Sequence, residues 1–181
     1  MHVDLVSEAQ HDSLIELLTE LHAFYNEGVR VPHDLVREHL LGNLLAPGSP
    51  HQLVVASTDA HTVVGLAAIT WVFSLVDFAP EQRRHCQLKE LYVKSGHRSA
   101  GAGRALMAWV AARAVAQGCH RIDWPVKATN ARGIAFYEGL GAFQVAERLS
   151  YRLLQPALGR VGGLHGPCVT ATRSTAADAI S

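Results

Sequence analysis

The chain has 181 residues, and its sixteen Lys and Arg balance its sixteen Asp and Glu, so its formal net charge at pH 7 is zero. This balance excludes a nucleic-acid-binding surface of the general basic kind, because binding to a phosphate backbone needs an excess of Lys and Arg. Hydrophobic residues make up 49% of the chain and charged residues 18%, which is typical of a globular domain and excludes a disordered chain.

The N-terminal region predicts one strand and two helices. Residues 2–6 alternate between apolar and polar side chains, as a short strand does. Ser7 and Gln10 have the spacing of a capping box, and leucines then recur at helical spacing to about Tyr25. A second short helix is expected over residues 33–45, after a segment that glycine and proline interrupt.

The remainder of the chain predicts strands and helices in alternation. We expect strands over residues 52–57, 63–73, 86–93, 121–126 and 145–153, and helices over residues 101–117 and 130–140. Gly118 and Gly141 end the two helices, because glycine readily adopts the left-handed conformation of a helix C-cap. This order predicts an α/β (α+β) fold in which a mixed central sheet is flanked by helices.

The composition changes near Pro156, where glycine and proline crowd together before an end rich in Thr, Ala and Ser. We expect a single domain over residues 1–155 and a flexible tail over residues 156–181. The N-terminus lacks the apolar core of a signal peptide, and the longest uncharged stretch, between Asp59 and Asp77, is shorter than the ~20 residues of a membrane span. We therefore expect a cytoplasmic protein with no membrane partner. Since no CxxC or HExxH pattern occurs, we also expect no metal site.

A glycine-containing loop between the strand at 86–93 and the helix at 101–117 is the most informative segment. It reads Arg98-Ser99-Ala100-Gly101-Ala102-Gly103-Arg104. Its glycines let a ligand approach the backbone, and the unpaired N–H groups of the first helical turn then point at that ligand. Such a helix start binds phosphate without a basic surface, and the two arginines add direct charge pairing. From the loop alone, a tight turn without a ligand is an equal alternative.

A second segment begins at Asn130, contains Phe136-Tyr137 and closes on Leu140-Gly141. Together, the two segments resemble the GNAT superfamily of acyl-CoA-dependent N-acetyltransferases. The loop is similar to the family's Arg/Gln-x-x-Gly-x-Gly/Ala motif, and the second segment is similar to its Asn, Phe-Tyr and Leu-Gly helix. The resemblance covers residues 53–153, and Leu88-Lys89-Glu90 is loosely similar to the spermidine/spermine acetyltransferase branch.

The resemblance implies that acetyl-CoA binds as a co-substrate between two parallel strands that splay apart, here residues 86–93 and 121–126. It implies that the pantetheine arm pairs with the backbone of the first strand and that the pyrophosphate lies on the amides of the glycine loop. It also implies that Asn130 hydrogen-bonds the arm and that Tyr137 lies near the thioester sulfur. The implied cofactor-binding residues are Leu91, Tyr92, Val93, Arg98, Ser99, Ala100, Gly101, Ala102, Gly103, Arg104, Asn130 and Tyr137.

Acyl transfer needs a neutral amine, a polarised thioester carbonyl and a proton for the leaving thiolate. The resemblance makes Tyr137 the general acid, and a phenol suits this role because it is still protonated at pH 7. A core aromatic paired with Phe136 is the alternative for Tyr137. Glu90 is the candidate base, directly or through water, and alternation along the strand places it on the same face as Tyr92. A solvated edge residue is the equal alternative for Glu90.

The predicted function is transfer of an acetyl group from acetyl-CoA to a primary amine of a small molecule, such as a polyamine or an aminoglycoside. We expect direct attack in a ternary complex, because neither motif contains a cysteine that could carry the acetyl group. Tyr25, Glu27 and Asp34 lie in the helical region that lines the acceptor site in the family. The alternatives are a protein lysine or N-terminal acetyltransferase and a non-catalytic acyl-CoA-binding sensor. The resemblance leaves open whether the chain forms a homodimer.

Overall fold

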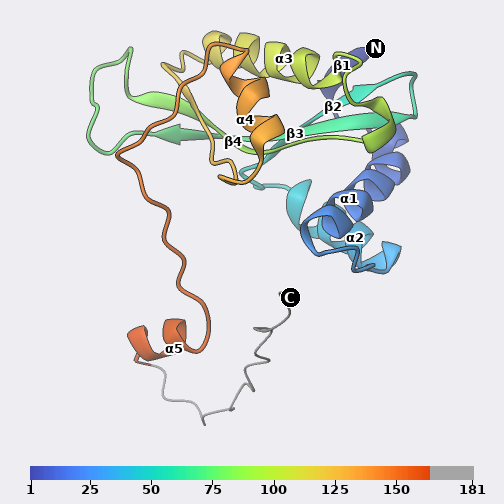
Figure 1. The fold of residues 1–181 in the computed structure, drawn as a ribbon, viewed down its shortest axis with the longest axis horizontal. Coiled ribbons are helices and arrows are strands. Elements are labelled where there is room, and N and C mark those ends of the chain that lie inside the picture. The colour runs from blue at the N-terminus through green and yellow to red at the C-terminus, as the bar shows by residue number, and fades with distance from the viewer. Residues whose placement is uncertain (164–181) are drawn as a thin grey trace, which may run out of the picture. The chain divides into compact units, whose positions relative to one another are not determined.

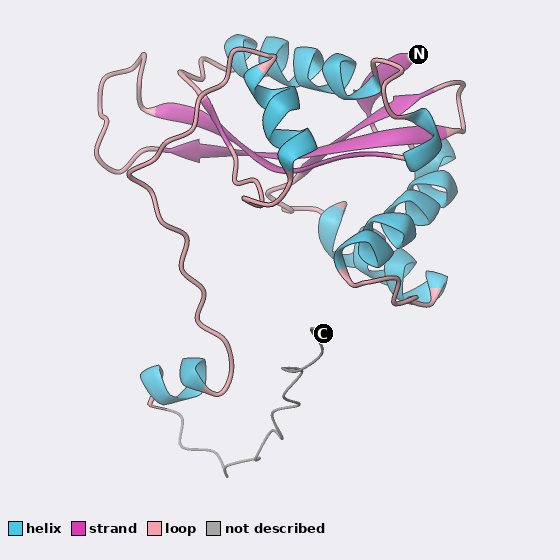
Figure 2. Cartoon of the chain, viewed as in Figure 1, coloured by secondary structure: helices cyan, strands magenta, loops and turns pink. Residues whose placement is uncertain are grey.

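A mixed five-stranded sheet is the central element of the structure, a computed structural model that describes residues 1–163. Contacts within the chain group residues 1–129 and residues 130–181 into two units, and the first unit holds the whole sheet. The strands are β1 (His2–Leu5), β2 (Gln52–Ser57), β3 (Val63–Phe73), β4 (Arg84–Val93) and β5 (Ile122–Asp123). They lie side by side in sequence order; β1 to β4 are antiparallel, and β5 runs parallel to β4. Figure 2 shows the strands of this sheet in magenta and the helices in cyan.

The helices of the first unit cover both faces of this sheet. They are η1 (Glu8–Gln10), α1 (His11–Tyr25), α2 (His33–His39), η2 (Leu40–Leu44), η3 (Ser95–His97) and α3 (Ala102–Ala116). Figure 1 shows α3 along one face of the sheet and α1 with α2 on the opposite face. The second unit contains α4 (Ala131–Glu138) and α5 (Ala157–Val161) among its described residues.

Coverage on both faces explains why the central strands are apolar throughout rather than alternating. In β2, Leu53 and Val55 pack into the core that contains Leu14 of α1. Val54 and Ala56 are fully buried as well, and alternation along the strand turns them to the opposite face, where α3 lies. Burial of each of these leucine and valine side chains contributes roughly 1.5–3 kcal/mol to folding.

Most predicted elements of the first unit are confirmed. The strands at 52–57 and 63–73 have their predicted bounds, and the helix expected at 101–117 forms as α3. The capping interaction also forms, because the Ser7 N–H donates to Gln10 Oε1 at 3.0 Å. The helix expected over 33–45 divides into α2 and a π-helical turn, η2.

Two predicted strands differ from the structure. The strand expected over 121–126 is limited to the two residues of β5, and Pro125, which lacks an N–H group, follows shortly after. The strand expected over 145–153 is wrong: these residues form no strand among those described. Leu149 and Tyr151 are 77% and 87% exposed, so the alternating pattern has no covered apolar face to favour pairing.

The tail predicted from residue 156 begins with a short helix, α5. Residues 164–181 of that tail lie outside the described part of the chain. The single-domain boundary and the flexible tail stay predictions.

Candidate active site

The end of β4 forms an unpaired sheet edge, because β4 and β5 diverge after a very short parallel pairing. The pairing joins Cys86 to Ile122 and Gln87 to Asp123. Beyond it, β4 continues to Val93 with no strand on this side in the described structure. The Gln87 Nε2 donates to the Asp123 carbonyl at 3.1 Å, at the point where the strands part. This geometry is the splayed pair of parallel strands expected from the sequence.

Two backbone groups near the end of β4 are bound by side chains instead of by a neighbouring strand. The Leu91 N–H donates to Glu90 Oε1 at 3.2 Å, and the Val93 carbonyl accepts from Arg98 Nε at 3.0 Å. Side-chain partners of this kind can be exchanged for those of an extended ligand lying along the edge. The edge therefore fits the backbone-paired arm of an acyl-CoA.

The loop from Arg98 to Arg104 leads into α3 through two residues with positive φ. They are Ser99 at 64° and Gly101 at 87°, and Gly101 is the N-cap of α3. The first backbone bond of the helix runs from the Ala105 N–H to the Gly101 carbonyl at 2.9 Å. The N–H groups of the preceding turn are the donors that a helix start offers to an anion.

Arg98 is held by the fold at the start of this loop. Besides its bond to Val93, its guanidinium lies 5.3 Å from the ring centre of Tyr92 and 5.6 Å from that of Phe24. The planar cation thus stacks on two aromatic rings, a contact that favours arginine over lysine. Sequence reasoning assigned Arg98 to phosphate binding and missed this packing.

Glu90 is the candidate base, and the structure places it against the C-terminal end of α1. The Tyr25 hydroxyl donates to Glu90 Oε1 at 3.1 Å, so a helix residue 65 positions away contacts the carboxylate. Burial raises the pKa of Glu90 above its usual range, although the Tyr25 and Leu91 hydrogen bonds partly oppose this rise. A carboxyl group with a raised pKa is better matched to proton transfer near neutral pH.

The Tyr92 side chain faces α1 as well, which confirms that Glu90 and Tyr92 share one face of β4. Its hydroxyl donates to Glu20 Oε1 at 2.9 Å, and the Ser95 N–H donates to the same oxygen at 3.0 Å. Burial and the contact with Glu20 raise the pKa of Tyr92 to about 12. Burial alone would raise the pKa of Glu20, but the bonds from Ser95 and Tyr92, together with the charge of Lys94, lower it.

Sequence reasoning missed Glu20 and Phe24, although both lie on the helix of α1 one turn apart. The one local signal was an acid at position 20, three residues after the buried Leu17. Of the three acceptor-site residues expected in this region, all are exposed, and Tyr25 contacts Glu90 through its hydroxyl.

Asn130 and Tyr137 belong to the second unit, where both lie on α4 or at its start. The Asn130 side chain is the N-cap of α4 and accepts from the Gly133 N–H at 2.9 Å. Asparagine is among the preferred N-cap residues, so this role was readable from the sequence. Tyr137 is half-buried and packs edge-on against Phe136, with ring centres 5.3 Å apart.

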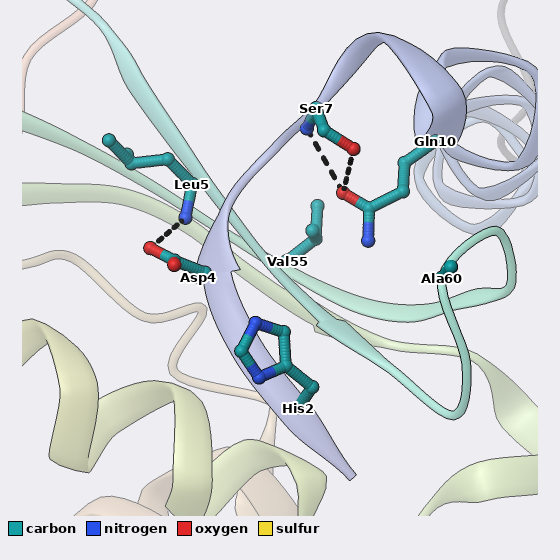
Figure 3. A pocket seen from close by; sticks show the side chains of 7 residues that line it. All are labelled: His2, Asp4, Leu5, Ser7, Gln10, Val55 and Ala60. Carbon is teal, nitrogen blue, oxygen red and sulfur yellow. Dashed lines mark hydrogen bonds between the residues drawn. The ribbon is translucent and has the colours of Figure 1, made fainter.

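Other features of residues 1–163 do not involve the predicted site residues. A shallow pocket of about 330 Å³ adjoins β1 and is lined by His2, Asp4, Leu5, Ser7, Gln10, Val55 and Ala60 (Figure 3). None of the predicted site residues lines it. Within this part of the chain, no three His, Cys, Asp or Glu side chains are grouped as a metal site would need. Nor is any helix there long and apolar enough to cross a membrane.

Comparisons with known proteins agree with the mixed sheet and flanking helices described above. Residues 14–142 match the family model of the acetyltransferase (GNAT) family. An integron cassette protein from the mobile metagenome of V. cholerae is 24% identical, with a TM-score of 0.79 over 89% of this chain and 96% of that chain. No curated protein matches the chain.

Two structures of named acetyltransferases share the fold at lower identity. A ribosomal-protein-alanine N-acetyltransferase from Brucella melitensis biovar Abortus 2308 is 20% identical, with a TM-score of 0.64 over 84% of this chain and 98% of that chain. An aminoglycoside acetyltransferase from an uncultured soil metagenomic sample is 15% identical, with a TM-score of 0.64 over 84% of this chain and 96% of that chain. At these identities, the likeness establishes a common fold.

Proposed function

The chain belongs to the acetyltransferase (GNAT) family, and on this premise we propose that it transfers an acetyl group from acetyl-CoA to a primary amine of a small molecule. One observation carries the proposal. A half-buried carboxyl group, Glu90, lies at the unpaired end of β4, where the Tyr25 hydroxyl donates to one of its oxygens. A proton acceptor is therefore fixed beside the edge that suits an extended acyl carrier.

The binding step uses backbone groups of the first unit. In this proposal, Leu91 N–H and Val93 carbonyl exchange their side-chain partners for the arm of acetyl-CoA, which supplies the acetyl group as an activated thioester. The amides of the loop from Arg98 to Arg104 bind its pyrophosphate at the start of α3. A chain of zero net charge can thus hold a polyanion, because the positive potential comes from aligned amides rather than from a basic surface.

The transfer step needs three proton movements. The acceptor ammonium first loses a proton to Glu90, directly or through water. Its neutral nitrogen then bonds to the acetyl carbon as the C–S bond breaks, and Tyr137 donates its hydroxyl proton to the departing sulfur, a role that rests on its match to the family's tyrosine. The positively charged amide nitrogen finally loses its second proton to the Tyr137 phenolate, directly or through water, which restores the hydroxyl. The backbone N–H near Tyr92 or Val93 polarises the thioester carbonyl.

Direct transfer is favoured over an acetyl-cysteine intermediate. Cys86 lies on β4 close to the site, but it is buried, and burial raises the pKa of its thiol to about 12. The thiolate is the nucleophilic form of cysteine, so Cys86 stays unreactive near neutral pH. We therefore propose attack within a ternary complex.

Two measurements test this function and separate it from the alternatives. Calorimetric titration with CoA should give a binding heat, and its absence would refute the proposed cofactor site. A panel of amines, containing polyamines, aminoglycosides and peptides with free N-termini or lysines, should show acceptor-dependent thiol release with the small amines. Release only with peptides would instead support a protein acetyltransferase, and CoA binding without any release would support a sensor.

A further inference from the structure

A positively charged side chain already lies on the aromatic ring that holds Glu90. The Lys127 Nζ is 4.8 Å from the ring centre of Tyr25, and the hydroxyl of the same ring donates to Glu90. Tyr25 therefore contacts an ammonium through its face and a carboxylate through its edge. Ammonium groups are attracted to aromatic faces at this separation, because the ring face carries negative potential.

Tyr25 is part of a larger aromatic wall. The Phe24 ring packs edge-on against Tyr25 at 5.4 Å and lies 5.8 Å from the ring of Tyr92. Arg98 occupies the faces of Phe24 and Tyr92, as described above. The cation on the Tyr25 ring differs from this arginine, because it is the ammonium of the long, unbranched side chain of Lys127.

Lys127 has the chemistry of an acceptor substrate, since it carries a primary ammonium on a chain of four methylene groups. We propose that the Tyr25 face is the subsite for the acceptor's ammonium, that Lys127 occupies it in the absence of an acceptor, and that the acceptors are unbranched alkyl amines. This inference rests on the proposed acetyl transfer and adds the class of its substrate. An amine attached directly to a sugar ring lacks the flexible methylene chain that places the Lys127 ammonium on the Tyr25 ring.

The subsite can be tested without any turnover. The chain has three lysines, Lys89, Lys94 and Lys127, so a protein labelled with ¹³C at the lysine ε-carbons gives three resolvable groups. The Lys127→Arg variant identifies the Lys127 signal by its loss. In the wild type, the Tyr25 ring should shift this signal away from the position it takes in Tyr25→Leu. Addition of n-butylamine at neutral pH should move it to that position, whereas glucosamine, whose amine is attached directly to the sugar ring, should not at the same amine concentration.

Kinetics give the second readout. Lys127→Met keeps the length of the side chain and removes its charge, so the KM for n-butylamine should fall by about threefold to tenfold, the range of a partly exposed cation–aromatic contact. Lys89→Met is the matched control, because Lys89 is an exposed lysine of β4 and the same charge is removed away from the Tyr25 ring face, so the KM should not change. Lys127→Arg retains a cation and should keep the KM near that of the wild type.

Failure of the subsite and failure of the acetyl transfer give different results. If butylamine moves the Lys127 signal but no amine supports thiol release, the subsite is supported and the transfer is refuted. If amines are acetylated while the Lys127 signal stays in place and Lys127→Met leaves the KM unchanged, the subsite is refuted. A Lys127 signal identical in the wild type and in Tyr25→Leu also refutes it.

Discussion

Glu20 and Glu90 have pKa shifts of opposite sign, and the difference follows from their partners. Glu90 is half-buried and accepts two hydrogen bonds that do not offset its burial, so its pKa is raised. Glu20 accepts from Tyr92 and Ser95 beside the charge of Lys94, so its pKa is lowered. Each shift makes folding stability depend on pH, because the folded and unfolded states bind protons differently.

The pair predicts opposite pH trends for two matched variants. The pKa of Glu90 is higher in the folded chain than in the unfolded chain. As the pH rises above the unfolded-state pKa, the unfolded chain therefore loses this proton first, and the contribution of Glu90 to the free energy of unfolding falls. The free energy of unfolding of Glu90→Gln relative to the wild type should therefore increase from about pH 4 to about pH 7. For Glu20→Gln, the free energy of unfolding relative to the wild type should decrease over the same pH interval. The reason is that Glu20, with its lowered pKa, stabilises the fold only when its carboxylate is charged. Urea unfolding at both pH values measures this, and parallel trends would contradict the assignment.

Tyr137 carries a prediction that separates chemistry from binding. If its hydroxyl protonates the leaving sulfur, Tyr137→Phe should lower kcat by about a hundredfold, within the range that removal of a general acid causes. The Kd for CoA should change by less than threefold, because the ring and its contact with Phe136 remain. Steady-state kinetics and calorimetry measure the two quantities. An unchanged kcat would leave Tyr137 as a packing residue.

At the scale of elements, the sequence predicted those strands and helices whose formation depends on residues close together in the chain. The strands at 52–57 and 63–73 and helix α3 were readable because their apolar runs and glycine ends are sufficient signals. The strand expected at 145–153 failed because pairing requires a neighbour that alternation cannot specify. The contacts of Tyr25 with Glu90 and of Glu20 with Tyr92 join residues 65 and 72 positions apart, and no local pattern indicates them.

The entry into α3 gives a prediction at this scale. Gly101 has φ of +87°, and a Cβ at this position would meet no atom within 4 Å, so Gly101→Ala adds conformational strain without a clash. The variant should lose about 1–2 kcal/mol of stability and bind CoA more weakly, because the strain acts on the loop proposed to hold the pyrophosphate.

Gly96→Ala is the matched control for that change. Gly96 also has open space around it, and it is not among the glycines with positive φ. Its substitution should leave the free energy of unfolding within about 0.5 kcal/mol of the wild type and the Kd for CoA unchanged. Equal effects of the two variants would show that the left-handed conformation of Gly101 is not what shapes the loop.

At the scale of the molecule, zero net charge and an anionic co-substrate are compatible because the proposed phosphate site is local. The first unit contributes the sheet edge, the loop before α3 and the contacts around Glu90. Asn130 and Tyr137 lie in the second unit, and their roles stay predictions of the family resemblance. Family membership and the mixed sheet were therefore predictable from the sequence, whereas the partners of Glu90 and Arg98 required the structure.

Thiol release from acetyl-CoA by the full chain with n-butylamine, compared between the wild type and Glu90→Gln, tests the central claim most directly. The wild type should release thiol only when the amine is present. Glu90→Gln should reduce kcat/KM at pH 7 by at least about a hundredfold, since the amide cannot accept the proton. The account would be contradicted by thiol release that does not depend on the amine, or by no release at all. An unchanged kcat/KM in Glu90→Gln would contradict the role of Glu90 as the base at the end of β4.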